Sequence, residues 1–190
     1  MTAYLTLEPV PESIDTERLL MRPYQPGDGA QLIEALLESK IELDPWFDWH
    51  QRFMTVEDAE DLVLRRRAAF IRRDDLTYAL FDRQSDRLLG ATGLHRPRWE
   101  DRVFEIGYFL RTSATGQGYM TEAVRALAAM ALTALKANRV EIWCDARNVA
   151  SQHVAERAGF TLEGRLRNHE VTHLGEVRDS LVYSVIPDRP

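Results

Sequence analysis

Cysteine is nearly absent from this sequence, because Cys144 is the only one in 190 residues. A single thiol excludes an internal disulfide and a zinc site built from several cysteines, and we expect no metal. Long apolar runs are missing too, since none approaches the ~18 residues of a membrane-spanning helix. No secretory signal pattern opens the chain. We therefore expect a cytoplasmic protein with no membrane partner.

An excess of positive charge is also missing, since 24 Lys and Arg residues stand against 30 Asp and Glu and the formal net charge is -6. Nucleic-acid binding generally needs a basic surface, so we expect no nucleic-acid partner. Hydrophobic residues make up 45% of the chain and charged residues 28%, which is ordinary for a globular protein. There is no internal repeat and no linker-like tract. We predict one domain over residues 1–190, long enough to bury a sizeable core.

The hydrophobic periodicity predicts a mixed α/β fold. Strands are expected at 17–24, 76–82, 87–94, 102–110 and 139–144, with two more between Phe160 and Ile186. The strand at 102–110, the helix after it and the strand at 139–144 form one crossover. Such a crossover joins parallel strands, so part of the sheet should be parallel.

Four helices are predicted from their first residues. Asp28 is expected to cap the first helix, whose buried face would consist of Leu32, Ile33, Leu36 and Leu37. Thr55 and Asp58 form a capping box before the second helix. The third helix follows Gly118. Asn148 is expected to cap the fourth helix, which ends at Gly159.

The stretch "RTSATGQGYMTEAV" places Gly116 and Gly118 between a strand and a helix. Glycines there allow the backbone to approach a ligand, and amides at the helix start suit a phosphate group. A plain tight turn is the other interpretation. A P-loop is excluded because no Lys-Ser or Lys-Thr pair follows Gly118. A dinucleotide fold fits poorly, because Thr121 replaces the third glycine and too few strand–helix repeats follow.

Two longer stretches carry a resemblance. "FEIGYFLRTSATGQGYMTEAV" and "DARNVASQHVAERAGFTLEGRLR" are similar to the hallmark segments of the GNAT superfamily of acyl-CoA N-acyltransferases. The opening "TERLLMRPY" also resembles the RimJ/RimL branch, the ribosomal-protein N-terminal acetyltransferases. The resemblance covers about residues 13–187. It implies a single domain with a central mixed, partly parallel twisted sheet flanked by helices, present as a monomer or homodimer.

The resemblance also implies the partners, which are acetyl-CoA and an amine acceptor, either a protein N-terminus or a small molecule. The backbone of the glycine turn would hold the diphosphate, through Thr115, Gly116, Gln117, Gly118, Tyr119, Met120 and Thr121. Main-chain groups of Phe109 and Leu110 would bind the pantetheine arm, together with the Asn148 side chain. Thr115 and Met120 depart from the family pattern, which has Arg or Gln at the first position and Gly or Ala at the second.

Ser151 is the candidate for protonating the leaving sulfur, because Ala155 stands where many family members carry a tyrosine. Glu170 is the first candidate for the base and Glu105 the second. An α-amine, with a pKa near ~8, is about 10% neutral at pH 7, whereas a lysine with a pKa near ~10.4 is not. A protein or peptide N-terminus is therefore the favoured acceptor, and a small-molecule amine is the alternative.

The segment "DPWFDWH" lies between the first two predicted helices. Trp46, Phe47 and Trp49 are expected to form a wall against the acceptor. The competing interpretation is that these aromatic side chains pack the two helices together. A module that binds coenzyme A without turnover is the remaining functional alternative.

Overall fold

The computed structural model describes residues 9–47, 55–173 and 175–188. Its strands are β1 (Ile14–Asp15), β2 (Leu19–Pro23), β3 (Leu76–Asp82), β4 (Leu88–Arg98), β5 (Val103–Leu110), β6 (Arg139–Asp145), β7 (Thr161–Val171) and β8 (Val177–Val185). Its helices are α1 (Gly29–Glu38), α2 (Lys40–Leu43), α3 (Val56–Arg72), α4 (Tyr119–Thr133) and α5 (Val149–Arg157), with a 3₁₀ turn at Thr112–Ala114. Within these ranges no helix is long and apolar enough to cross a membrane.

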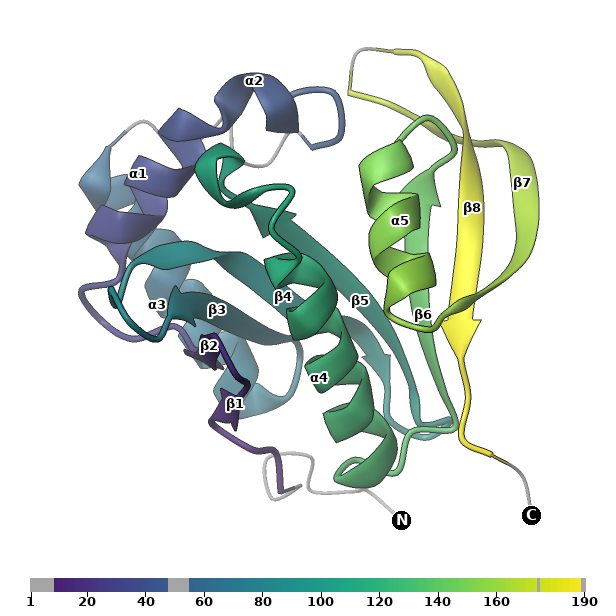
Figure 1. Cartoon of the computed structure of the whole chain (residues 1–190), viewed down its shortest axis with the longest axis horizontal. Coiled ribbons are helices and arrows are strands. Elements are labelled where there is room, and N and C mark those ends of the chain that lie inside the picture. Colours follow the sequence, from purple (N-terminus) through teal and green to yellow (C-terminus); the bar gives the residue numbers. More distant parts are fainter. Residues whose placement is uncertain (1–8, 48–54, 174, 189–190) are drawn as a thin grey trace.

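The eight strands form one sheet in the order β1-β2-β3-β4-β5-β6-β8-β7. All neighbours are antiparallel except β5 and β6, which are joined through α4 and run parallel. The predicted mixed, partly parallel sheet is therefore confirmed. Helices cover both of its faces, with α4 and α5 on one side and α1 and α3 on the other (Figure 1).

Each face of the sheet has its own apolar core. On the α4 face, Val124 and Leu127 of α4 pack against Phe104, Ile106 and other residues that alternate along the strands. On the opposite face, Leu32, Leu36 and Val63 from α1 and α3 pack against a second set that includes Ala79 and Phe109. The two residue sets of β5 thus face opposite sides of the molecule.

The parallel pair at the centre of the sheet is short. Only three register pairs join β5 to β6, and Glu105 opposite Glu141 is the last. Beyond it β5 stays paired with β4 up to Leu110, while β6 stays paired with β8. The two strands therefore diverge in the middle of the sheet, and they leave a gap between two half-sheets.

Two local predictions for α1 are wrong. The Asp28 side chain does not cap the helix; it accepts hydrogen bonds from the Arg22 guanidinium (2.7 and 2.9 Å) and from the Gln25 amide (2.7 Å) instead. The part-buried Arg22 guanidinium, held over the Phe81 ring, competes successfully for that carboxylate. Leu37 is half exposed and lies off the apolar face.

Two other predicted helix starts are confirmed. Thr55 and Asp58 form the reciprocal capping box of α3. Asn148 caps α5 by accepting a hydrogen bond from the Ser151 amide (3.0 Å). The short elements β1 and α2 were not predicted, because two to four residues are too few to show periodicity.

Candidate active site

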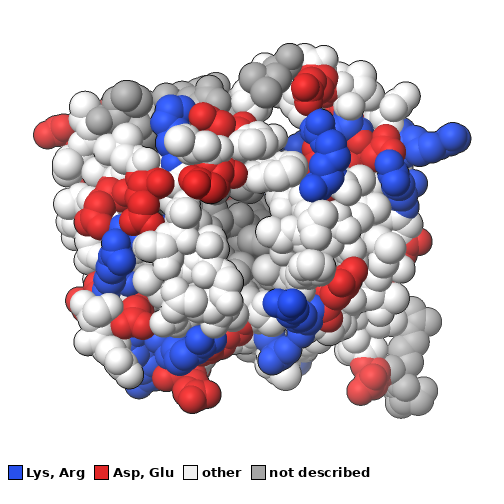
Figure 2. All heavy atoms as spheres, turned by 45° about the horizontal axis from the view of Figure 1, so that its top comes forward, with Lys and Arg blue, Asp and Glu red and all other residues white. Residues whose placement is uncertain are grey.

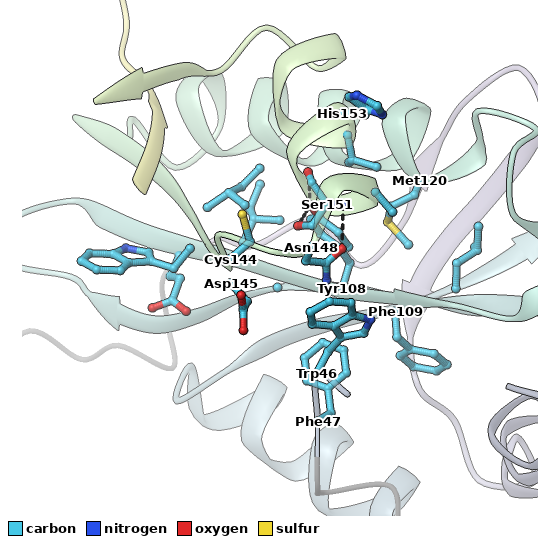
Figure 3. Close-up of a pocket in the computed structure, with 18 of the residues that line it drawn as sticks. Trp46, Phe47, Tyr108, Phe109, Met120, Cys144, Asp145, Asn148, Ser151 and His153 are labelled. Carbon is cyan, nitrogen blue, oxygen red and sulfur yellow. Dashed lines mark hydrogen bonds between the residues drawn. The ribbon is translucent and has the colours of Figure 1, made fainter. Parts of the chain in front are cut away.

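A cleft of about 1150 Å³ occupies the gap between β5 and β6. The face shown in Figure 2 is hollowed near its middle, and charged side chains gather around the hollow. In Figure 3, Asn148, Ser151 and His153 lie on one side of the diverging strands, and Asp145, Trp46 and Phe47 lie on the other. The cleft therefore opens toward both faces of the sheet, so two molecules can reach its centre from opposite sides.

The glycine turn forms one wall of this cleft. Gly116 (φ 74°) and Gly118 (φ 81°) both adopt the left-handed conformation that side chains disfavour. The first intrahelical bond of α4 runs from the Glu122 amide to the Gly118 carbonyl (3.0 Å). The amides of the first turn, residues 119–121, precede that bond and carry the positive end of the helix dipole. The geometry fits a diphosphate.

The side chains of the turn make contacts within the protein. Thr115 Oγ1 donates to the Thr112 carbonyl (2.8 Å), and Gln117 Nε2 donates to the Ser113 carbonyl (3.0 Å). Met120 is buried in the core, and the Tyr119 hydroxyl donates to Asp82 (3.3 Å). Any contact of these residues with a phosphate would accordingly come mainly from their backbone amides.

Helix α1 holds the approach to the turn in place. The buried Arg111 guanidinium donates to Glu34 (2.6 Å) and also pairs with Glu38. Glu38 accepts a further hydrogen bond from the Ser113 amide (2.8 Å), and the hydrogen bonds from Arg111 lower the pKa of Glu38 to about 2. The Thr112 amide donates to Ser39 Oγ (2.9 Å). The acidic end of α1 thus fixes the strand-to-turn junction.

Main-chain direction distinguishes the two residues predicted to bind pantetheine. The Phe109 carbonyl is directed at Gly90 in β4, where an added Cβ would lie 2.2 Å from that oxygen. Because main-chain groups alternate in direction along a strand, those of Tyr108 and Leu110 face the gap instead. Leu110 therefore has the orientation that the predicted role requires, and Tyr108 shares it.

Ser151 lies in the first turn of α5 and lines the cleft. Its hydroxyl is 2.8 Å from the Tyr108 hydroxyl, which also lies 3.2 Å from the Ser151 carbonyl oxygen. Burial raises the pKa of Tyr108, so the phenol stays protonated and can donate. Asn148 Oδ1 accepts the capping hydrogen bond from the Ser151 amide, and its Nδ2 group is the donor that a ligand can use. The single phenol proton of Tyr108 goes to the Ser151 carbonyl oxygen or to Ser151 Oγ, and these contacts hold the serine hydroxyl in place.

The opposite side of the cleft is rich in carboxylates. Glu105 and Glu141 are register partners at the last pair of the parallel ladder. Burial raises the pKa of Glu105, and within the described part of the chain its carboxylate pairs with the exposed Arg96 guanidinium alone (3.4 Å). Although burial opposes the shift, hydrogen bonds from Trp143 (2.9 Å) and Arg139 lower the pKa of Glu141. Glu105 is the more basic of the two.

Glu170 also lines the cleft, on β7, but it is held differently. Its carboxylate pairs with the Arg178 guanidinium, its register partner on β8. That hydrogen bond lowers the pKa of Glu170. The neighbouring His169 ring packs on Trp143 at 5.2 Å and its Nδ1 lies 2.9 Å from Ser180 Oγ.

The aromatic wall is described in part. Trp46 and Phe47 line the cleft, whereas Trp49 lies outside the described residues. Phe47 also packs against the core beneath α1 and α3, as the packing interpretation of this segment predicted, and its role against an acceptor stays a prediction. Tyr108, Trp143 and Arg178 were not predicted to line the cleft. Only strand pairing brings them there, and no local motif marks them.

A search of family models gives one match, an acetyltransferase (GNAT) domain over residues 18–161. This chain belongs to the GNAT family. It is similar to the ribosomal-protein-serine acetyltransferase of Escherichia coli, with 30% identity covering 73% of this chain and 76% of that protein. It is 33% identical to "Probable N-acetyltransferase YjcK" of Bacillus subtilis, where the match spans 62% of this chain and 65% of the relative.

Solved structures of this GNAT family agree with the fold. RimL, a ribosomal L7/L12 α-N-protein acetyltransferase solved with coenzyme A, aligns with a TM-score of 0.84 and 27% identity over 92% of this chain and 98% of that one. The chain is therefore an N-acetyltransferase that uses acetyl-CoA as its cosubstrate. The glycine turn, the first amides of α4 and the open cleft have the form that this cosubstrate requires.

Proposed function

We propose that this chain transfers the acetyl group of acetyl-CoA to the α-amine of a protein or peptide, by direct attack in a ternary complex. The observation that carries the proposal is the cleft that opens on both faces of the sheet. Acetyl-CoA on the α4–α5 side and an amine on the carboxylate side reach the same gap together. This arrangement holds both reactants in line without a covalent enzyme intermediate.

The acceptor side supports a cationic acceptor. Glu105, Glu141 and Asp145 lie on one face of neighbouring strands, with Trp46 and Trp143 beside them. The names of the relatives add support, since two of them are acetyltransferases of ribosomal proteins. An α-amine also loses its proton more easily than a lysine amine, by about 2 pKa units.

In the proposed reaction Glu105 is the base. Its raised pKa brings it closer to that of the ammonium group, which favours proton transfer. Glu170, the first candidate from the sequence, is the weaker choice because its carboxylate is paired with Arg178. Ser151, oriented by Tyr108, donates to the departing sulfur. The amide of Leu110 faces the gap and is placed to hydrogen-bond the acyl carbonyl.

A thiol-release assay with matched acceptors tests this function. Peptides with a free N-terminus are compared with the same peptides N-formylated but carrying an internal lysine, and with polyamines, amino acids and aminoglycosides. We expect release only with the peptides that carry a free N-terminal α-amine. Release with the small amines alone would assign the enzyme to small-molecule acetylation. Binding of acetyl-CoA without release in any case would indicate a non-catalytic module.

A further inference from the structure

A histidine outside the cleft lies next to the proposed base. His95 of β4 is the register partner of Glu105 of β5, and the two side chains share the carboxylate face of the sheet. Directly opposed residues of an antiparallel pair have Cβ atoms about 5 Å apart. His95 and Arg96 both lower the pKa of Glu105, in opposition to the effect of burial. The imidazole therefore interacts electrostatically with the base.

Two glycines make room for this ring. A Cβ added at Gly107 would lie 2.8 Å from Cδ2 and 3.1 Å from Nε2 of His95, and one added at Gly93 would lie 3.0 Å from Cε1. The imidazole thus lies flat across two strands, in a slot that side chains at either position would fill. Its Nε2 atom lies over Gly107, which follows Glu105 on the same face of β5.

The other ring nitrogen is held by a carboxylate. His95 Nδ1 lies 2.6 Å from Asp75 Oδ2. Asp75 also accepts a hydrogen bond from Thr77 Oγ1 (2.5 Å) and pairs with Arg66 of α3 (3.3 Å). Burial opposes the shift, but these partners lower the pKa of Asp75, so it is an anion at neutral pH. An anionic partner keeps Nδ1 protonated and leaves Nε2 as the proton acceptor.

Resting on the function proposed above, we propose that His95 and Asp75 form a proton exit for Glu105. Glu105 takes a proton from the acceptor ammonium, leaving the neutral amine. The Glu105 carboxylic acid then passes that proton through one bridging water to His95 Nε2, which restores the carboxylate and forms an imidazolium paired with Asp75. The imidazolium releases the proton to water, for which its 27% exposed side chain provides contact.

The need for this exit follows from the cleft. Glu105 lines it and is 25% exposed, so bound acetyl-CoA and acceptor would cover its direct route to solvent. His95 does not line the cleft and keeps its own exposure when the cleft is filled. Arg66, Arg96, Glu141 and Glu170 are the other charged groups whose fields act on Glu105 or Asp75.

The kinetic test compares His95→Gln, His95→Ala and Asp75→Asn at several pH values. At pH 6, where the acceptor enters as an ammonium, His95→Gln should lower kcat about tenfold, which is part of the 10² to 10⁴ typical of acid–base catalysis. At pH 9 the loss should shrink to within about twofold, because the amine enters neutral. Asp74→Asn is the matched control, since Asp74 pairs with the exposed Arg72 instead.

If His95 only stabilises the structure through its contact with Asp75, the activities of the variants differ from this expectation. Glutamine can still donate to Asp75, so His95→Gln would then retain activity and only His95→Ala would lose it, equally at every pH. That result overturns the proposal. A loss of equal size in both His95 variants, confined to low pH, supports it.

Nitrogen NMR separates this proposal from the function on which it rests. In Glu105→Gln the ¹⁵N resonance of His95 Nε2 should move while that of Nδ1 stays in place. An unchanged Nε2 resonance overturns the proton exit, whether or not the enzyme turns over an amine. A moved resonance in a protein that acetylates no amine supports the coupling and refutes the proposed function alone.

Discussion

The two sides of the cleft use different parts of the chain. The acetyl-CoA side is built mainly from backbone, namely the left-handed turn at Gly116 and Gly118, the first amides of α4 and the gap-facing groups of β5. The acceptor side is built from side chains, with Glu105, Glu141 and Glu170 set on three different strands. Under the proposed function, acetyl-CoA is therefore bound mainly by backbone conformation, whereas the acceptor contacts side chains that can change without altering the fold.

The largest expected effect is on the acceptor side. Glu105→Gln should lower kcat by about 10²-fold or more, because it removes the proposed base. The Kd for acetyl-CoA should stay within about twofold of the wild-type value, since Glu105 lies on the acceptor side of the cleft. Stopped-flow turnover and calorimetric binding measure the two quantities.

Glu170→Gln is the matched control for this change. Because Glu170 pairs with Arg178, it should cost less than tenfold in kcat. A larger loss in Glu170→Gln than in Glu105→Gln would return the role of base to Glu170.

The pH dependence of the wild type tests the same residue. The wild-type kcat/KM should fall as pH drops through the raised pKa of Glu105, because this carboxylate must be ionised to act. This decrease at low pH should vanish in Glu105→Gln.

The next largest effect concerns Ser151 and the Tyr108 hydroxyl beside it. Ser151→Ala should lower kcat about tenfold with little change in acetyl-CoA affinity, and Tyr108→Phe should lower it less. Since Tyr108 acts through the serine hydroxyl, adding Tyr108→Phe to Ser151→Ala should cost nothing further. Additive losses in the double variant would show that Tyr108 has a separate role.

A smaller effect is expected from the backbone of the acetyl-CoA side. Gly118→Val forces a branched side chain into φ 81° and should raise the KM for acetyl-CoA about tenfold, while the KM for the acceptor stays unchanged. Gly159→Val is the control, because Gly159 has a similar φ of 93° at the end of α5 and does not line the cleft. Equal KM values for the two variants would contradict binding of the diphosphate at the turn.

The smallest effect concerns stability alone. Thr55→Ala removes one half of the capping box of α3 and should lower the free energy of unfolding by about 1 kcal/mol. Thermal unfolding measures the loss. Kinetic constants for both substrates should not change, because α3 packs beneath the acceptor side without lining the cleft. A changed acceptor KM would show that α3 positions the carboxylate side directly.

The contrast between backbone features and side-chain clusters also explains which parts of the site could be predicted from the sequence. Gly118 and Asn148 act on the backbone within three residues of themselves, so their effects can be read from short stretches. His95, Glu105 and Glu141 become neighbours only through strand register, which no local pattern specifies. Asp28 shows the limit of local rules, since Arg22 on the preceding strand removes it from its expected cap.

The short parallel ladder is the narrowest link in the sheet. Only the pairing from Val103 to Glu105 ties the first five strands to the last three through the sheet. Amide hydrogen exchange should therefore be faster along the open edge of β6 than inside either half. Acetyl-CoA bound between the two half-sheets would contact both of them. Amide hydrogen exchange along β6 should therefore be slowest when the cosubstrate is bound.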